Sequence, residues 1–137
     1  IIGKDCAVSV INRTQSRSIS MAKQFEGVGK VGVILPEQLA EDLNHFDMII
    51  NTTPAQVDQI PAFLPQKADL QQTYCYDIGY ANTYTPFLDW ALQHQAKAVA
   101  DGLGMLVEQA ALSFTLWHQV PVNTAPVLTL LQETQRQ

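Results

Sequence analysis

Two arginines near the start of the chain have the type and spacing to bind a phosphate. Arg13 and Arg17 stand four residues apart, directly after an apolar run that ends in Asn12. A guanidinium can hold a phosphate through two parallel hydrogen bonds, and its planar face can stack on adenine. Cations are mildly unfavourable at the start of a helix, so a bound anion would explain this placement. The alternative is a pair of solvated arginines.

Asn12, the residue before the first arginine, indicates which dinucleotide cofactor such a site would bind. Dinucleotide folds that prefer NAD usually end their second strand with an acid that binds the ribose 2′-hydroxyl, whereas NADP binding uses a nearby arginine. Neutral Asn12 followed by Arg13 therefore favours NADP. No GxGxxG phosphate loop occurs in the sequence. Gly27 and Gly29 come before a predicted strand instead of after one, and Gly102 and Gly104 lack the third glycine of the motif.

Polar turns also follow three later apolar runs, at Asn51–Pro54, Asp77–Tyr80 and Asp101–Gly104. If those runs are parallel strands, their carboxyl ends meet at one edge of a sheet, where open α/β sheets bind ligands. The alternative is that these loops are simply polar and rich in glycine. We expect a shared crevice at this edge.

The elements that would position these turns alternate along the chain. Apolar, β-branched runs predict strands at about 7–11, 31–34, 46–50, 73–76 and 97–100. Helical patterns, with proline or threonine near their starts, predict helices at about 14–25, 36–43, 86–94, 104–118 and 126–133. The third strand is continuously apolar, as expected when both faces are covered. The alternation predicts an α/β fold with a parallel sheet and flanking helices.

Composition limits the class of protein. The 137 residues are 47% hydrophobic and 15% charged with a net charge of −5, which predicts one packed domain and argues against nucleic-acid or anionic-membrane partners. The absence of a long apolar run and of a signal-peptide pattern leads us to expect a cytoplasmic protein. We expect Cys6 and Cys75 to be buried free thiols. Because the chain opens within an apolar stretch without Met, we expect a piece of a longer protein.

The remaining polar and aromatic candidates point to structural roles. The three histidines lack metal-ligand spacing, so we expect surface or helix-end roles and no metal site. The two tryptophans, Trp90 and Trp117, are expected in a core or a domain contact. Asp77 and Asp101 could form an acid/base pair, but orienting a loop or capping a helix is the preferred interpretation.

The motifs at the strand ends resemble those of shikimate dehydrogenases, in the same order and at the same spacing over essentially the whole chain. The run that opens at Asp101 and includes Gln109 is specific, whereas Asn-Arg-Thr is shared with other dinucleotide-binding enzymes. The motifs that carry the resemblance are Asn12-Arg13-Thr14-Gln15-Ser16-Arg17, Asn51-Thr52-Thr53-Pro54, Tyr76-Asp77-Ile78-Gly79-Tyr80, Thr85-Pro86 and Asp101-Gly102-Leu103-Gly104-Met105-Leu106-Val107-Glu108-Gln109-Ala110-Ala111.

This resemblance implies the NADPH-dependent reduction of 3-dehydroshikimate to shikimate, a step toward chorismate and the aromatic amino acids. In the family, a substrate domain with a catalytic Lys–Asp pair comes first, followed by the Gly-rich loop of the nucleotide domain. Residues 1–137 would then be the C-terminal, NADP-binding, Rossmann-like domain, with a final helix at about 124–135 that packs back toward the substrate domain. No catalytic residue is expected in the chain, which would be inactive alone.

The resemblance also assigns site residues. Four match the clamp for the adenosine 2′-phosphate, four lie along the rest of the cofactor, and two match contacts to shikimate. The three sets are, in that order, Asn12, Arg13, Thr14 and Arg17; Thr52, Ile78, Gly102 and Met105; and Tyr80 with Gln109. Met105 and Gln109 are four residues apart and so share one helix face. Gly79 replaces a bulkier residue common in close relatives.

Without the strand that carries the phosphate loop, the predicted sheet lacks its central member. The first and third strands would each keep an unpaired edge, which recruits other chains. We expect closure of the gap, pairing with a second copy as a homodimer, or a further segment that fills it. Two other functions remain open, an NAD-preferring quinate/shikimate dehydrogenase and a non-catalytic Rossmann-like binding module.

Overall fold

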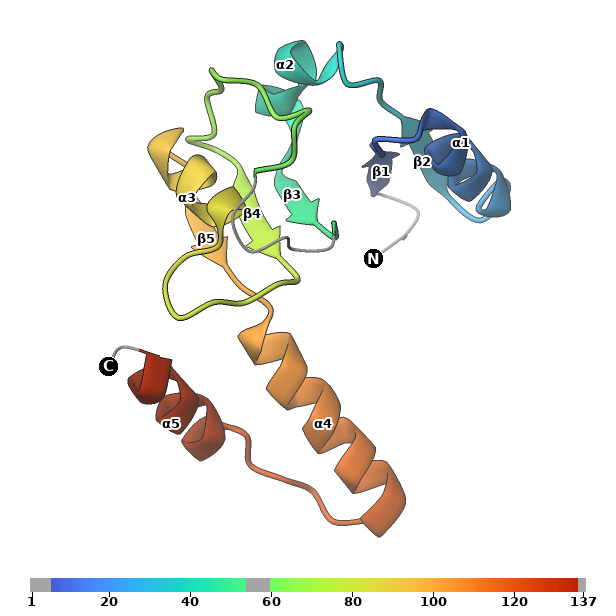
Figure 1. Ribbon diagram of the computed structural model, residues 1–137. Coiled ribbons are helices and arrows are strands. Elements are labelled where there is room, and N and C mark those ends of the chain that lie inside the picture. Colours follow the sequence, from blue (N-terminus) through green and yellow to red (C-terminus); the bar gives the residue numbers. More distant parts are fainter. Residues whose placement is uncertain (1–5, 54–59, 136–137) are drawn as a thin grey trace. The chain divides into compact units, whose positions relative to one another are not determined.

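The computed structural model describes residues 6–53 and 60–135 (Figure 1). These residues fall into two compact units. One lies within Ile1–His45 and Ala62–Ala68, and the other within Phe46–Pro61 and Asp69–Gln137. Each unit contains its own set of parallel strands.

The first unit is a β-α-β segment followed by short helices. Its elements are β1 (Ala7–Val10), α1 (Gln15–Gln24), β2 (Lys30–Val33), α2 (Leu39–Asp42) and the 3-10 helix η1 (Leu43–His45). β1 and β2 are parallel, with Ala7 opposite Lys30 and Val10 opposite Val33. Gly27 has φ +82°, a left-handed conformation that ends the turn after α1 and that glycine adopts without steric cost.

The second unit is built on a three-stranded parallel sheet. Its elements are β3 (Met48–Asn51), β4 (Tyr74–Asp77), α3 (Pro86–Gln93), β5 (Ala98–Ala100), α4 (Leu103–His118) and α5 (Ala125–Gln135). The strand order is β3-β4-β5. The last residues of β3 and β4, Asn51 and Asp77, stand opposite each other in register. The carboxyl ends of the strands therefore share one edge.

The core of the second unit forms between α3 and the sheet. Phe87, Leu88, Trp90 and Ala91 on α3 are buried, and α3 packs on β4 and β5. Pro86 opens α3 at a position where a missing N–H costs nothing. This packing fixes the position of the residues just before the helix.

The predicted Rossmann-like α/β fold is confirmed. Every predicted strand and helix is present, although the helix expected from Pro36 begins at Leu39. The partial orders β1–β2 and β3-β4-β5 are those of the Rossmann order 3-2-1-4-5-6 without its first strand. In the described part of the chain, β1 and β3 each pair with a single neighbour, as expected for an incomplete sheet.

Two expectations about burial are wrong, and a third is narrowed. The third strand is not covered on both faces, because Met48 and Ile50 are 54% and 41% exposed on one of them. Cys6 is exposed, since it precedes β1, a strand in which every second residue faces solvent. Trp117 is 76% exposed and so is not a core residue, whereas Trp90 is. The domain-contact alternative remains for Trp117.

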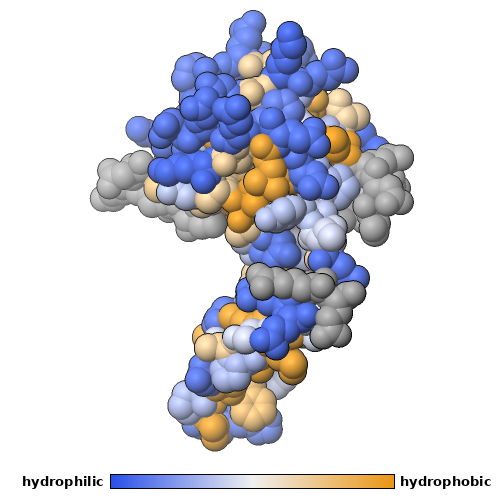
Figure 2. Space-filling model, turned by 90° about the vertical axis from the view of Figure 1, so that its left-hand side faces the viewer, coloured by the Kyte–Doolittle hydropathy of each residue, from blue (hydrophilic) through white to orange (hydrophobic). Residues whose placement is uncertain are grey.

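The α4 helix is apolar on more than one face. Its exposed side chains include Leu112, Leu116 and Trp117. α5 turns back alongside α4, and the two helices carry hydrophobic residues scattered over their surface, at the lower end of the molecule in Figure 2. A helix that is apolar all round is usually buried in a larger structure. No helix among the described residues is long and apolar enough to cross a membrane.

The two cysteines provide a test of this fold. Cys75 in β4 is buried, and burial raises the pKa of its thiol to about 11, so at pH 8 it is both protonated and shielded. We expect a thiol reagent at pH 8 to label one cysteine of the native chain rapidly and the second only in denaturant. The Cys6→Ser variant should lose the rapid phase. Two rapidly labelled cysteines in the native chain would contradict the burial of β4.

Candidate functional site at the strand ends

In the first unit, the turn from β1 into α1 presents two cations beside free helix N–H groups. Asn12 Oδ1 accepts a hydrogen bond from the Thr14 N–H at 2.8 Å, which fixes the turn. Thr14 occupies the N-cap position of α1, but its hydroxyl makes no capping hydrogen bond. Arg13 and Arg17 are exposed, and the first turn of α1 contains no acidic residue. The turn is thus cationic and suited to an anion.

In the second unit, a buried carboxylate lies where the strands end. Asp77, 1% exposed, accepts three hydrogen bonds. Its Oδ2 accepts from Asn51 Nδ2 at 3.1 Å and from Thr85 Oγ1 at 2.7 Å, and its Oδ1 accepts from the Gly79 N–H at 2.9 Å. The side chains of Asn51 and Thr85 are also buried. A buried charge needs such compensation, so this cluster is a fixed feature of the sheet edge.

Backbone hydrogen bonds join the three loops at this edge. The Ile78 N–H donates to the Asn51 carbonyl at 3.0 Å, and the Gly102 N–H donates to the Gly79 carbonyl at 3.0 Å. The loop after β4 is therefore held on one side by the end of β3 and on the other by the start of α4. The predicted convergence of Thr52, Ile78 and Gly102 at one edge is what the structure contains.

Gly102 is required for the close approach of two loops rather than for its own backbone angles. Its φ is −78°, which any residue can adopt. A Cβ at this position would lie 2.0 Å from the Ile78 carbonyl oxygen and 2.7 Å from the Ile78 carbonyl carbon. A Cβ at Gly104, two residues further along, would meet nothing within 4 Å. The first glycine thus sets the spacing between the β4 loop and α4.

The side chains assigned to ligands are exposed around these fixed loops. Ile78 and Tyr80 follow β4, and Met105 and Gln109 lie on the first turns of α4; all four are exposed. Thr52, the first residue after β3, is exposed as well. The polar cluster beneath is buried, so the site combines a rigid base with accessible side chains.

The structural roles expected for the other polar residues are confirmed. Asp77 orients the loop after β4, and Asp101 Oδ1 accepts from the Leu103 N–H at 3.1 Å at the start of α4. Neither forms an acid/base pair with the other. His45, His94 and His118 all lie at helix ends. Within residues 6–53 and 60–135, no group of three or more His, Cys, Asp and Glu side chains could hold a metal ion.

The sequence interpretation missed the partners that complete this cluster. Asn51 Oδ1 accepts from both the N–H and the hydroxyl of Thr53, at 3.1 and 2.7 Å, while its Nδ2 group faces Asp77. Thr85 caps α3, because its Oγ1 accepts from the Leu88 N–H at 3.3 Å. Asn51 and Thr85 both lie in motifs noted for their position at strand or helix ends, but nothing in their spacing indicates that they share one carboxylate.

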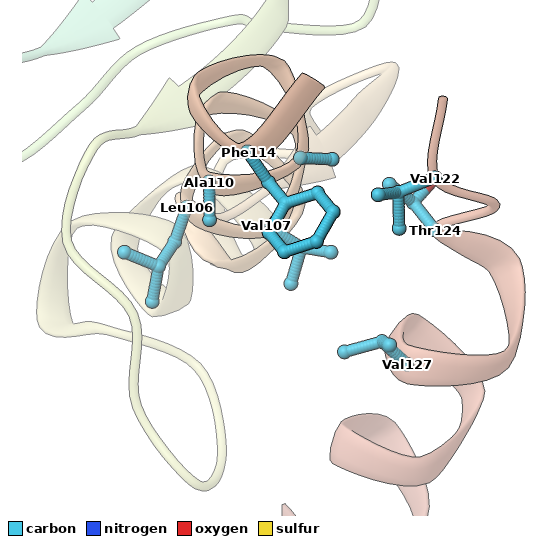
Figure 3. A pocket seen from close by; sticks show the side chains of 8 residues that line it. Leu106, Val107, Ala110, Phe114, Val122, Thr124 and Val127 are labelled. Atoms are coloured by element: carbon cyan, nitrogen blue, oxygen red, sulfur yellow. The ribbon is translucent and has the colours of Figure 1, made fainter. Parts of the chain in front are cut away.

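An apolar cavity of about 410 Å³ lies between α4 and α5. Val107, Ala110 and Phe114 face Val122 and Val127 across it (Figure 3). The hydroxyl of Thr124, its one polar lining residue, donates to Glu108 Oε1 at 2.6 Å. The cavity offers no acid, base or metal ligand, so it is suited to an apolar side chain rather than to a polar substrate.

The fold defines the class of protein, an α/β fold of the Rossmann type, with a cationic turn in its first unit and hydrogen-bonded strand-end loops in its second. Residues 102–132 match the model of the shikimate 5′-dehydrogenase C-terminal domain. The predicted resemblance is thereby confirmed: the chain is similar to shikimate dehydrogenases in its fold and in this segment.

Solved structures of shikimate dehydrogenases match nearly the whole chain. The enzyme from Aquifex aeolicus matches 96% of it at 27% identity with a TM-score of 0.67, and the chain covers 45% of that protein. A shikimate dehydrogenase in complex with NADP+ matches 87% at 27% identity with a TM-score of 0.70, and 43% of that protein is covered.

A third structure supports the fold. The Listeria monocytogenes shikimate 5-dehydrogenase, in complex with shikimate and NAD, matches 91% of the chain at 19% identity with a TM-score of 0.76, and 47% of that protein is covered. The chain therefore spans less than half the length of each of these three proteins.

The close approach at Gly102 leads to a prediction with an internal control. Gly102→Ala should lower the free energy of unfolding by roughly 1–3 kcal/mol, because the new methyl group overlaps the Ile78 carbonyl. Gly104→Ala, in the same helix turn, should leave stability unchanged or raise it by up to about 1 kcal/mol. Urea denaturation of both variants measures the difference. Equal stabilities would show that the two loops separate easily.

Proposed function

We propose that the chain is the NADP-binding C-terminal part of a shikimate dehydrogenase, an oxidoreductase that interconverts 3-dehydroshikimate and shikimate. The proposal takes the substrate from the relatives, among which the Listeria monocytogenes protein was solved with shikimate. NADP, when bound, supplies the hydride acceptor or donor of this reaction. The residues of this chain bind and orient it.

The observation that carries the choice of NADP is the cationic turn at the start of α1. Arg13 and Arg17 flank helix N–H groups with no acidic residue in the first turn, and Asn12 stands where an NAD-preferring fold usually has an acid. A 2′-phosphate would accept hydrogen bonds from both guanidinium groups, and Thr14 and Asn12 would complete the clamp. An NAD-specific site would have no use for this charge.

The loops of the second unit fit the other end of the cofactor. The loops that contain Thr52, Ile78 and Gly102 are held to one another by backbone hydrogen bonds, and the side chains of Thr52 and Ile78 are exposed. In our proposal they bind the nicotinamide end, with Met105 beside them on α4. Rigid loops suit this task, because hydride transfer depends on holding the ring in one orientation.

Two exposed side chains near these loops would bind the substrate. Tyr80 offers a hydroxyl and Gln109 an amide, both of which can hydrogen-bond a hydroxylated carboxylic acid. Gln109 shares a helix face with Met105, so one face of α4 would serve cofactor and substrate. The catalytic acid/base pair would come from the substrate domain, and the chain alone would be inactive.

The apolar surface of α4 and α5 supports a place next to that second domain. Exposed Leu112, Leu116 and Trp117 on α4, together with the cavity between the helices, leave apolar area that a larger protein would bury. We propose that the rest of the shikimate dehydrogenase fold packs here, and that α5 is the helix that returns toward it. Cofactor and substrate would then lie between the two domains.

Substitution of one arginine tests the cofactor assignment in the full-length protein. Arg13→Ala should raise KM for NADPH by about 10- to 100-fold, the equivalent of roughly 1.5–3 kcal/mol, because a charge-assisted phosphate contact is lost. KM for NADH should change little. Lys23→Ala, which removes a cation from the last turn of the same helix, should alter neither. Equal losses for both cofactors would refute the assignment of a 2′-phosphate clamp.

Substitution of Gln109 tests the substrate assignment. Gln109→Ala should weaken shikimate binding by about fivefold or more, in line with the ~1 kcal/mol of one lost hydrogen bond. NADP+ affinity should stay the same. Gln93→Ala on α3 serves as a matched control, and titration calorimetry of the full-length protein with each ligand provides the measurement. Unchanged shikimate affinity would remove Gln109 from the site.

The 137-residue chain by itself provides a third test. With shikimate and NADP+ at saturating concentrations, the purified chain should show no NADPH formation at 340 nm above a protein-free blank, because in our proposal the acid/base pair belongs to the substrate domain. The full-length protein at equal concentration is the positive control. Turnover by the chain comparable to that control would overturn the assignment of catalysis to another domain.

A further inference from the structure

We propose that Asp77 is a positioning residue that sets the geometry of the nicotinamide-end loops through a buried hydrogen-bond cluster with Asn51 and Thr85. What these loops bind rests on the proposed function. That the carboxylate determines their geometry rests on the contacts alone. Asp77 touches neither cofactor nor substrate in this account, so its effect on the reaction is indirect.

The hydrogen bonds of Asp77 lead to three different parts of the site. The Gly79 N–H belongs to the loop after β4, Asn51 to the end of β3, and Thr85 to the start of α3. All three bonds use groups that only donate toward the carboxylate. An ionised Asp accepts hydrogen bonds on both oxygens, and no other side chain of this size offers that pattern. These bonds occupy three of the roughly four acceptor sites of the carboxylate.

Asn51 extends the effect to the turn after β3. Its Oδ1 accepts twice from Thr53, and its Nδ2 donates to Asp77, so the amide has one satisfactory orientation. Rotation by 180° would set donors against Thr53 and an acceptor against the carboxylate. The Asn–Asp pair thereby fixes the turn that contains Thr52, the residue proposed beside the cofactor.

Thr85 anchors the same carboxylate to the core. Its hydroxyl donates to Asp77, and its Oγ1 accepts from the Leu88 N–H in the first turn of α3. α3 is the helix whose buried face forms the core of this unit. The strand-end loops are therefore held in a fixed position relative to the core of the second unit.

A purely stabilising role would not need this chemistry. Replacing buried charged clusters with apolar residues of similar volume is often neutral or stabilising, whereas a satisfied polar network specifies one geometry. At this edge, geometry is what hydride transfer requires, because a displacement of about 1 Å can cost ~100-fold in rate. The cluster lies directly beneath exposed Ile78 and Thr52, where such a displacement would matter.

The test uses three variants of the full-length protein. Asp77→Asn replaces one acceptor oxygen with an NH2 group, which must face either the Gly79 N–H or the Asn51 and Thr85 donors. The double variant Asn51→Asp with Asp77→Asn exchanges donor and acceptor and restores the pair between these two residues, since the new carboxylate can still accept from Thr53, but it does not restore the bond from the Thr85 hydroxyl. Asp69→Asn is the control, because Asp69 Oδ1 likewise accepts a hydrogen bond from the N–H two residues on, that of Gln71, in an exposed turn. All are assayed at a temperature where each is fully folded by circular dichroism.

We expect Asp77→Asn to lower kcat by about tenfold or more while shikimate KM changes less than about twofold, and the double variant to recover part of that loss, because the Asn–Asp pair is restored and the Thr85 bond is not. Asp69→Asn should match the original protein. A loss of thermal stability in Asp77→Asn with kcat unchanged would reduce Asp77 to a structural residue. Failure of the double variant to exceed the single one would overturn the role of the Asn–Asp pair.

A second measurement separates this inference from the proposed function. Amide hydrogen exchange at Gly79 and Thr53 should accelerate about tenfold in Asp77→Asn and return in the double variant, whether or not the protein oxidises shikimate. If the unmodified full-length protein does not turn over shikimate, the proposed function fails, but the exchange data still test whether Asp77 positions the loops. Unchanged exchange at both amides would overturn that positioning role.

Discussion

The burial of one carboxylate at the end of β4 is the constraint on which the ligand edge depends. The Asp77 side chain is 1% exposed and accepts hydrogen bonds from the end of β3, the loop after β4 and the start of α3, and a carboxyl group buried to this extent needs such partners. Their convergence places the turn after β3, the loop after β4 and the start of α3 in fixed relation. The Gly102 N–H then joins α4 to the same loop. The burial of this one carboxyl group thus fixes the turn after β3, the loop after β4 and the starts of α3 and α4 relative to one another.

The first unit works by a different principle. Its turn between β1 and α1 is exposed and held by one local hydrogen bond from the Thr14 N–H to Asn12. In our proposal, two exposed guanidinium groups and the helix N–H groups bind the phosphate without a buried cluster. A phosphate tolerates several directions of approach, whereas a nicotinamide ring must face its substrate in one orientation.

The sequence was sufficient for the order and parallel pairing of the strands, since β-branched runs alternate with capped helices. It also located the ligand edge, because Asn51, Asp77 and Asp101 each follow an apolar run. It failed where burial depends on neighbours. Ile50 was expected to be covered and is exposed, and Cys6 lies outside the strand that was expected to bury it. The hydrogen bonds that tie Thr85 to Asp77 depend on side-chain directions that no spacing rule contains.

A crystal structure of the full-length protein with NADP+ and shikimate bound tests the central claim most directly, namely that this chain provides the cofactor site of an NADP-dependent shikimate dehydrogenase. The account predicts the 2′-phosphate within hydrogen-bonding distance of the Arg13 and Arg17 guanidinium groups, and the nicotinamide ring against the backbone of Ile78 and Gly102. A cofactor bound elsewhere, or a 2′-phosphate directed into solvent away from both arginines, would contradict it.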